Sequence, residues 1–150
     1  MTFVEAVRVC LKDKYCCFRG RASRSEFWWF SLCIGLINFG ATLLLSPLPR
    51  ETAMGLNFLV SLALLPPNLG VTARRLHDRN LRGWWLLIPI VSLLLWLLGR
   101  GAPGGEAGPT STLLSLSMCL CYLAILSMPG TAGPNRFGPD PLAAEKRGAE

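Results

Sequence analysis

Charge is the property that this sequence has least of. Asp, Glu, Lys and Arg make up only 16% of its 150 residues, against about a quarter in an ordinary soluble domain, while hydrophobic residues make up 51%. Four stretches have no charged residue at all: 27–49, 52–73, 83–99 and 110–128. Four such runs are not expected in a water-soluble globular domain of this length. The pattern predicts a membrane protein, because runs of this length can cross a hydrocarbon core of ~30 Å as helices.

A cysteine framework is also missing. The chain has six cysteines but no CxxC pair, and Cys16 and Cys17 are adjacent. Neither a disulfide scaffold nor a zinc-binding motif has that spacing. A metal site built from Cys16, Cys17 and His77 is an alternative on ligand chemistry alone, and no ligand spacing supports it. We therefore expect reduced thiols, no metal and no cofactor.

Catalytic patterns are equally scarce. His77 is the only histidine, and it directly precedes Asp78. Such a pair can act as acid and base, but no serine or cysteine nucleophile can be assigned to it. We expect a structural hydrogen-bonding role for His77 and no enzymatic activity. An enzyme acting on lipid or phosphate is the least favoured hypothesis.

The basic residues that are present lie at the ends of the apolar runs. A nucleic-acid module spreads its basic residues over a water-exposed face, so the net charge of +6 does not predict a nucleic-acid partner. Two turns carry one basic residue each, Arg50 and Arg100. The others fall into an amino-terminal arm, a central segment and a tail: Arg8, Lys12, Lys14, Arg19, Arg21 and Arg24; Arg74, Arg75, Arg79 and Arg82; Arg136, Lys146 and Arg147. Four spans with both termini in the cytoplasm satisfy the positive-inside rule at every loop.

We predict an all-α integral membrane bundle of four transmembrane helices preceded by a short amphipathic interfacial helix. A single membrane domain is expected over residues 1–141, with spans at about 27–46, 52–73, 83–99 and 110–128, and a disordered tail over 142–150. Pro66 and Pro67 predict a kink in the second span, and Pro89 predicts a bend in the third. The glycines and prolines after Met128 argue against a fifth helix.

Residues 2–18 have the apolar spacing of an amphipathic helix, with Thr2 and Glu5 placed as a capping box. This helix either lies in the headgroup plane or packs as an ordinary helix on the cytoplasmic ends of the bundle, and the sequence favours neither. At the start of the first span, Ser23 or Ser25 is placed to cap the helix.

The segment Arg74–Arg82 contains five charges and the only histidine in nine residues. We predict that it is a cytoplasmic loop joining two transmembrane helices. The four-span topology brings it to the same membrane face as the segment around Arg21 and the tail around Arg136. The candidate binding site on this face comprises ten residues: Arg21, Arg24, Glu26, Arg74, Arg75, His77, Asp78, Asn135, Arg136 and Asp140.

For two acids of this set, placing a charged carboxylate near lipid costs free energy. We therefore expect Glu26 and Asp78 to pair with Arg74, Arg75 or Arg136.

The charged segments and the tryptophan pair form an ordered set of motifs: Gly20-Arg21-x-Ser23-Arg24-x-Glu26-Phe27-Trp28, Arg74-Arg75-Leu76-His77-Asp78, Gly83-Trp84-Trp85, Pro129-Gly130-Thr131 and Asn135-Arg136-Phe137-Gly138-Pro139-Asp140. This set closely resembles the YhaH-like family, a group of small bacterial inner-membrane proteins known as a domain of unknown function. The resemblance implies a bacterial membrane protein and brings no reaction, ligand or catalytic residue. It also implies a single span between the tryptophan pair and the asparagine-arginine motif. Here 49 residues separate Trp85 from Asn135, enough for two spans and a turn. Either this protein has an additional helix, or the relatives fold this region differently.

Three functions remain open. The first is a binding or scaffold role, in which the basic residues form a cytoplasmic site for an anionic headgroup or a phosphate-bearing ligand. The second is a small transporter or channel component, suggested by Pro66-Pro67-Asn68 and by Glu26 and Asp78 near the bundle interior. The third is a purely structural protein, whose charges anchor its topology and tie helix ends together. The lipid bilayer is the expected partner, and a homo-oligomer or a complex with other membrane proteins stays open.

Overall fold

The computed structural model describes residues 1–99 and 108–143 of the chain. Within these residues the regular structure is helical, and the one β contact is a two-residue bridge between Asn135 and Gly138. The all-α prediction is confirmed. In order, the elements are α1 (Phe3–Arg8), the π-helical turn η1 (Val9–Asp13), α2 (Arg24–Leu45), α3 (Arg50–Asp78), the 3-10 turn η2 (Gly83–Leu86), α4 (Leu87–Leu98) and α5 (Pro109–Ser127).

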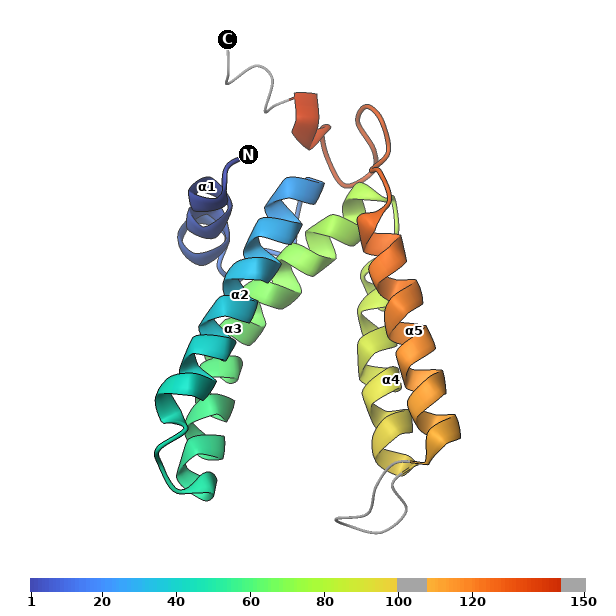
Figure 1. Cartoon of the computed structure of the whole chain (residues 1–150). Helices are drawn as coiled ribbons and strands as arrows, with labels where there is room; N and C mark the ends of the chain where they lie inside the picture. Colours follow the sequence, from blue (N-terminus) through green and yellow to red (C-terminus); the bar gives the residue numbers. More distant parts are fainter. Residues whose placement is uncertain (100–107, 144–150) are drawn as a thin grey trace.

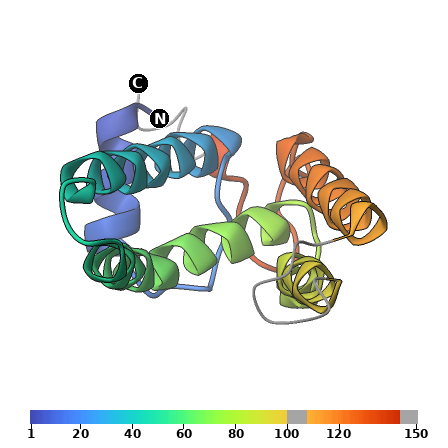
Figure 2. The same ribbon diagram turned by 60° about the horizontal axis from the view of Figure 1, so that its bottom comes forward.

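The helices α2 to α5 form two antiparallel hairpins that meet at one end (Figure 1). α2 packs against α3, and α4 packs against α5. Figure 2 shows the two pairs as separate groups of helices. The amino-terminal arm, the end of α3 and residues 129–143 all lie at the end where the hairpins meet. The basic segments of the sequence are therefore gathered at one end, as the predicted topology requires.

Three of these helices are long and apolar enough to cross a membrane: α2, α3 and α5. Only 11–17% of their most apolar stretches is buried inside the protein, so most of their side chains face outward, as they do in helices surrounded by lipid. The third predicted span is a shorter apolar helix, Gly83–Leu98. The described residues thus contain three helices of spanning length, and the four-span count stays a prediction.

Proline explains why the third apolar segment begins with a 3-10 turn. Pro89 has no N–H, so it cannot donate the α-helical bond to the carbonyl of Trp85. The chain makes the 3-10 turn η2 there, and the α-helix begins at Leu87. With 12 residues, α4 is about 18 Å long.

The prediction of a loop over Arg74–Arg82 is wrong for the first half of this segment. α3 continues to Asp78, because residues 71–78 contain neither proline nor glycine. The chain turns only at Asn80, which has a left-handed φ of 58°. Leu81 N–H then donates to the Leu76 carbonyl at 2.9 Å, and Asn80 N–H donates to the His77 carbonyl at 2.9 Å, which is a Schellman motif.

The length of α3 affects where its charges lie. Its 29 residues give a helix of about 43 Å, which exceeds a hydrocarbon core of ~30 Å. A membrane with Arg50 at one interface would therefore leave the charged end of α3 outside the hydrocarbon. That position lowers the cost of the arginines and acids found there.

Pro66 and Pro67 lie inside α3, which continues through them. In Figure 1 the second half of α3 leans away from the line of its first half, in agreement with the predicted kink. Pro67 leaves the carbonyl of Ala63 without its helical donor. The Tyr15 hydroxyl donates to that carbonyl at 2.5 Å, so a side chain of the amino-terminal arm satisfies the break.

The amino-terminal helix is shorter than predicted. The capping box is confirmed, with Thr2 N–H donating to the Glu5 carboxylate at 2.8 Å and Glu5 N–H donating to the Thr2 hydroxyl at 3.4 Å. Helical structure ends at Asp13, because η1 closes with a wide turn and the backbone then leaves the helix. Ala6 and Cys10 are buried, and α1 packs on α2. The position of this helix in the headgroup plane stays a prediction.

After α5 the chain is irregular to residue 140, and residues 141–143 are helical. The predicted turn containing Arg100 and most of the predicted disordered tail fall on residues 100–107 and 144–150. They lie outside the described residues.

Candidate functional site at the charged end of the helices

Glu26 lies in the first turn of α2. Ser23 is the N-cap, and its hydroxyl accepts a hydrogen bond from Glu26 N–H at 3.2 Å. Arg74 of α3 pairs with this acid, with 2.5 Å between Nη1 and Oε1, and both side chains are buried. Arg74 also donates to the Gly70 carbonyl at 3.3 Å and to Cys10 Sγ at 3.6 Å. Burial raises the pKa of the Cys10 thiol to about 11, so this thiol stays protonated at neutral pH.

Asp78 accepts hydrogen bonds from two arginines. Arg21 Nε donates to Oδ1 at 2.9 Å, and Arg75 Nη1 donates to Oδ2. All three side chains are buried, with exposed fractions of 7% for Arg21, 0% for Arg75 and 3% for Asp78. We call Arg21, Arg75 and Asp78 the clasp. Two guanidinium groups share one carboxylate there, and their remaining donors bind backbone carbonyls.

Those carbonyls belong to the end of α5 and to the segment that follows it. Arg75 Nε donates to the Leu126 carbonyl at 2.9 Å, and Nη2 donates to the Met128 carbonyl. Arg21 donates to the carbonyls of Thr131 and Gly133, each at 2.5 Å. The last carbonyls of a helix have no partner within the helix, so Arg75 caps α5. The clasp thereby joins the start of α2, the end of α3 and the end of α5.

Residues 129–140, which we call the strap, cover the end of α3. Thr131 donates to the Asp78 carbonyl through its N–H at 2.9 Å and through its hydroxyl at 3.0 Å. Asn135 Nδ2 donates to the His77 carbonyl at 2.9 Å. A Cβ placed on Gly130 would lie 1.9 Å from Asp78 Oδ2, so this position needs glycine. The strap satisfies carbonyls that α3 itself leaves unpaired.

His77 has the structural surroundings expected of it. Its ring stacks on Phe137, with centroids 4.0 Å apart and an interplanar angle of 6°. Nδ1 lies 3.2 Å from the Gly20 carbonyl. The Arg136 guanidinium lies over the Phe137 ring, 4.7 Å from the ring centre. It also donates to the Asn80 carbonyl at 2.6 Å.

Asp140 closes the strap. Its Oδ1 accepts from Leu142 N–H at 3.0 Å, and its Oδ2 accepts from Gly133 N–H at 3.1 Å. These backbone N–H groups, Leu142 first, hold the pKa of Asp140 below its usual value. The carboxylate is therefore charged at neutral pH.

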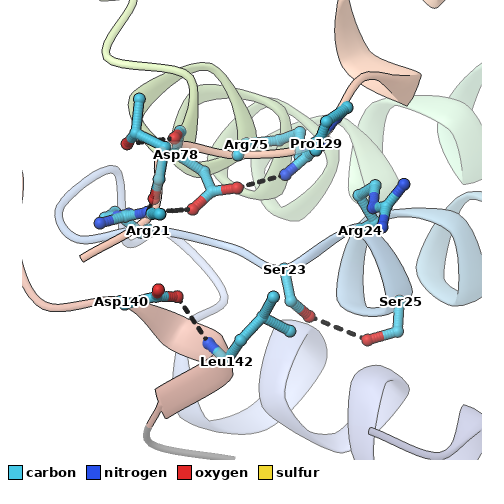
Figure 3. Close-up of a pocket in the computed structure, with 12 residues that line it drawn as sticks. Arg21, Ser23, Arg24, Ser25, Arg75, Asp78, Pro129, Asp140 and Leu142 are labelled. Atoms are coloured by element: carbon cyan, nitrogen blue, oxygen red, sulfur yellow. Dashed lines mark hydrogen bonds and ion pairs between the residues drawn. The ribbon is translucent and has the colours of Figure 1, made fainter. Parts of the chain in front are cut away.

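A pocket of about 370 Å³ opens between the start of α2, the clasp and the strap (Figure 3). Figure 3 shows Arg24 and Asp140 on different sides of Ser23. Arg24 is exposed, and its side chain has no ion-pair or hydrogen-bond partner within the described part of the chain. The polar side chains that line the pocket are Arg21, Ser23, Arg24, Ser25, Arg75, Asp78, Thr131 and Asp140.

All ten predicted site residues lie at this end of the molecule. The expected pairs of Glu26 with Arg74 and of Asp78 with Arg75 are present, whereas Arg136 binds a backbone carbonyl instead. Arg74 and Arg75 are fully buried, and their guanidinium groups are paired with Glu26 and Asp78, although Arg75 forms part of the pocket wall. Within residues 1–99 and 108–143, no three His, Cys, Asp or Glu side chains gather closely enough to hold a metal ion.

Sequence reasoning missed three contributors to this end: Cys10, Gly130 and Thr131. Cys10 lies against the Glu26–Arg74 pair, and Thr131 caps α3. Cysteine spacing gave no signal for the first, because a single thiol in an amphipathic stretch looks like any small apolar residue. Pro129-Gly130-Thr131 was visible as a motif, but its role needs the close approach of Gly130 to Asp78.

Comparison with known proteins adds the family. The family described as protein of unknown function (DUF805) matches residues 15–139. This chain belongs to that family. The DUF805 match includes the whole clasp and nearly the whole strap, and it ends one residue before Asp140.

Three DUF805-like relatives come from Escherichia coli (strain K12). Inner membrane protein YhaH is 31% identical over 130 residues, covering 85% of this chain and 88% of the relative. Inner membrane protein YhaI is 30% identical over 127 residues, covering 85% and 87%. Uncharacterized protein YiiR is 33% identical over 129 residues, covering 82% and 84%. No solved structure matches the chain.

The family and the three long apolar helices identify a membrane protein. Since the matched shares of both chains are nearly equal, the relatives have about this chain's length. That similarity argues against an added helix as the source of the 49-residue spacing between Trp85 and Asn135.

Proposed function

We propose that this protein is an inner-membrane protein whose cytoplasmic end binds a phosphate-bearing anion, such as an anionic lipid headgroup, in the pocket beside α2. The proposal rests on the exposed side chain of Arg24, which is unpaired within the described residues. It lines the pocket, is exposed, and has no side-chain partner in the described ranges. The other two arginines of the pocket, Arg21 and Arg75, are already paired with Asp78.

The chemistry around Arg24 suits phosphate. Arg24 is the first residue of α2, so it lies at the positive end of the helix dipole, which favours an anion. Ser23 and Ser25 have their hydroxyl oxygens 2.9 Å apart and add further donors. A guanidinium group can bind two phosphate oxygens at once.

The orientation in the membrane is part of the proposal. The printed names of YhaH and YhaI describe inner membrane proteins, and we extend that location to this chain. The basic arm and the end of α3 lie at one end of the molecule, and Arg136 is bonded to Asn80 there. The positive-inside rule favours the cytoplasm for that end. Four spans would then leave both termini in the cytoplasm, next to the headgroups of the inner leaflet.

The buried arginines have a different part in this proposal. Arg74 and the clasp hold the helix ends and the strap together, and Arg24 is left to contact the ligand. A purely structural role for the whole charged end is the second candidate, and the complete pairing of Glu26 and Asp78 favours it.

Lipid retention tests the proposal. We expect Arg24→Gln to lower the retention of phosphatidylglycerol about fivefold in native mass spectrometry of the purified protein, since one basic side chain near a membrane contributes ~1 kcal/mol. Arg19→Gln is the matched control, because Arg19 is an exposed arginine of the same arm that does not line the pocket. Calorimetric titration with inorganic phosphate separates a soluble phosphate ligand from a lipid headgroup. Equal retention by the parent protein and both variants would contradict the proposal and favour the structural role.

A further inference from the structure

The pocket beside α2 is lined by a negatively charged group as well as by positively charged groups. Arg24 of α2 contributes one free guanidinium group. Asp140, from the strap, contributes a carboxylate to the same pocket. The remaining charges that line it are Arg21, Arg75 and Asp78, which are buried and bound to one another. A ligand entering the pocket therefore meets one unpaired cation and one carboxylate with no arginine bonded to it.

The Asp140 carboxylate is fixed and can accept a further hydrogen bond. Its oxygens accept the backbone N–H groups of Leu142 and Gly133, and the Ala143 N–H also bonds to this carboxylate. An ionised carboxylate has about four acceptor positions, so about one is left for a ligand. Because both oxygens are held by the backbone, the carboxylate does not rotate freely.

From this arrangement we infer that the ligand is a phosphate that carries a primary ammonium group, as in a phosphoethanolamine headgroup. The phosphate lies against Arg24 and the start of α2, and the ammonium group donates to Asp140. The inference rests on the proposed phosphate site and adds the second half of the ligand. The volume of about 370 Å³ falls at the small end of ligand pockets, which suits a headgroup rather than a nucleotide.

Hydrogen bonding sets the expected selectivity. A primary ammonium group has three N–H donors, whereas the quaternary ammonium of choline has none. Both headgroups have the same net charge, so a difference between them reports the N–H donors. Phosphatidylglycerol carries the phosphate without any ammonium group and reports the Arg24 side alone.

The experiment compares three lipids with identical acyl chains: phosphatidylethanolamine, phosphatidylcholine and phosphatidylglycerol. Retention of each is measured by native mass spectrometry on the full-length protein. We expect about fivefold higher retention of phosphatidylethanolamine than of phosphatidylcholine, the effect of one partly exposed charged contact. Asp140→Asn should remove this preference. Arg24→Gln should lower the retention of phosphatidylethanolamine and phosphatidylglycerol together.

A second arm identifies the source of the headgroup. Calorimetric titrations with soluble phosphoethanolamine and soluble phosphocholine repeat the comparison without acyl chains. Tighter binding of phosphoethanolamine in this arm supports the inference with a soluble ligand. The same preference found only in the lipid arm supports it with a lipid ligand.

The inference and the proposed function fail in different ways. Equal retention of phosphatidylethanolamine and phosphatidylcholine by the parent protein, with no preference in the soluble arm, overturns the ammonium site. The phosphate site survives that result if Arg24→Gln still lowers phosphatidylglycerol retention. Since the decisive comparison uses the unsubstituted protein, it stands even if Asp140→Asn loosens the strap, which a thermal melt would reveal.

Discussion

α2 and α3 are joined by charged and amide side chains, whereas α4 and α5 are joined by serines. In the first hairpin, Asn38 accepts from the Ser61 hydroxyl at 3.1 Å, and the Glu26–Arg74 pair lies near the end. In the second, Ser92 and Ser115 each donate to the other's backbone carbonyl, at 3.0 and 2.9 Å. Hydrogen bonds suffice to align two helices of small and apolar residues. The first hairpin also positions charges, and it forms one wall of the candidate site.

The two hairpins differ in the free energy that is lost when one interacting side chain is removed. Hydrogen bonds between membrane helices contribute on average ~0.6 kcal/mol, because the separated helices also find partners. A buried ion pair that loses one member leaves a charge without compensation, at a cost of about 3–5 kcal/mol. We therefore expect the stability of the charged end to depend on a few residues, and that of the second hairpin on many small contacts.

The largest effect is expected at Asp78. Asp78→Ala leaves Arg21 and Arg75 buried without their shared carboxylate, and it should lower the free energy of unfolding by about 3–5 kcal/mol. Unfolding with increasing SDS, followed by circular dichroism, measures this loss. Glu51→Ala is the control, because it removes an exposed acid from the opposite end of α3. Equal losses for the two variants would show that the clasp does not stabilise the fold.

The strap comes next. Gly130→Ala places a Cβ 1.9 Å from Asp78 Oδ2, so the strap or the aspartate must move. We expect a loss of about 1–3 kcal/mol in the same assay, the usual cost of overpacking. Gly35→Ala in α2 has no heavy atom within 4 Å of its new Cβ and should be neutral or stabilising. A neutral Gly130→Ala would mean that the strap is not held against α3.

The smallest effect is expected in the second hairpin. Ser92→Ala removes one of the two reciprocal hydrogen bonds and should cost about 0.6 kcal/mol. Ser117→Ala serves as the comparison, since that exposed hydroxyl donates only to Leu114 within its own helix, and it should change nothing. If Ser92→Ala cost as much as Asp78→Ala, the contrast between the hairpins would be wrong.

Much of the architecture follows from where charge is absent. Charge-free runs of about 20 residues have few alternatives to a helix in lipid, because each backbone polar group needs a partner inside its own segment. The gathering of Glu26, Asp78 and the arginines at one end also follows, since the basic residues lie at alternate ends of those runs. The expected pairing of each acid with an arginine rests on the cost of burying a single charge.

The sequence by itself determined the helical class, the positions of the apolar runs and the end at which the charges gather. Only the tertiary structure decided that Arg74 and Arg75 lie in a helix and are buried, that Arg21 shares Asp78, and that Arg24 is left free to face a pocket. The reason is that all of these arginines look alike in one dimension. Which of them is consumed by a buried partner depends on the distances between helix ends and on a strap that arrives more than fifty residues later in the chain.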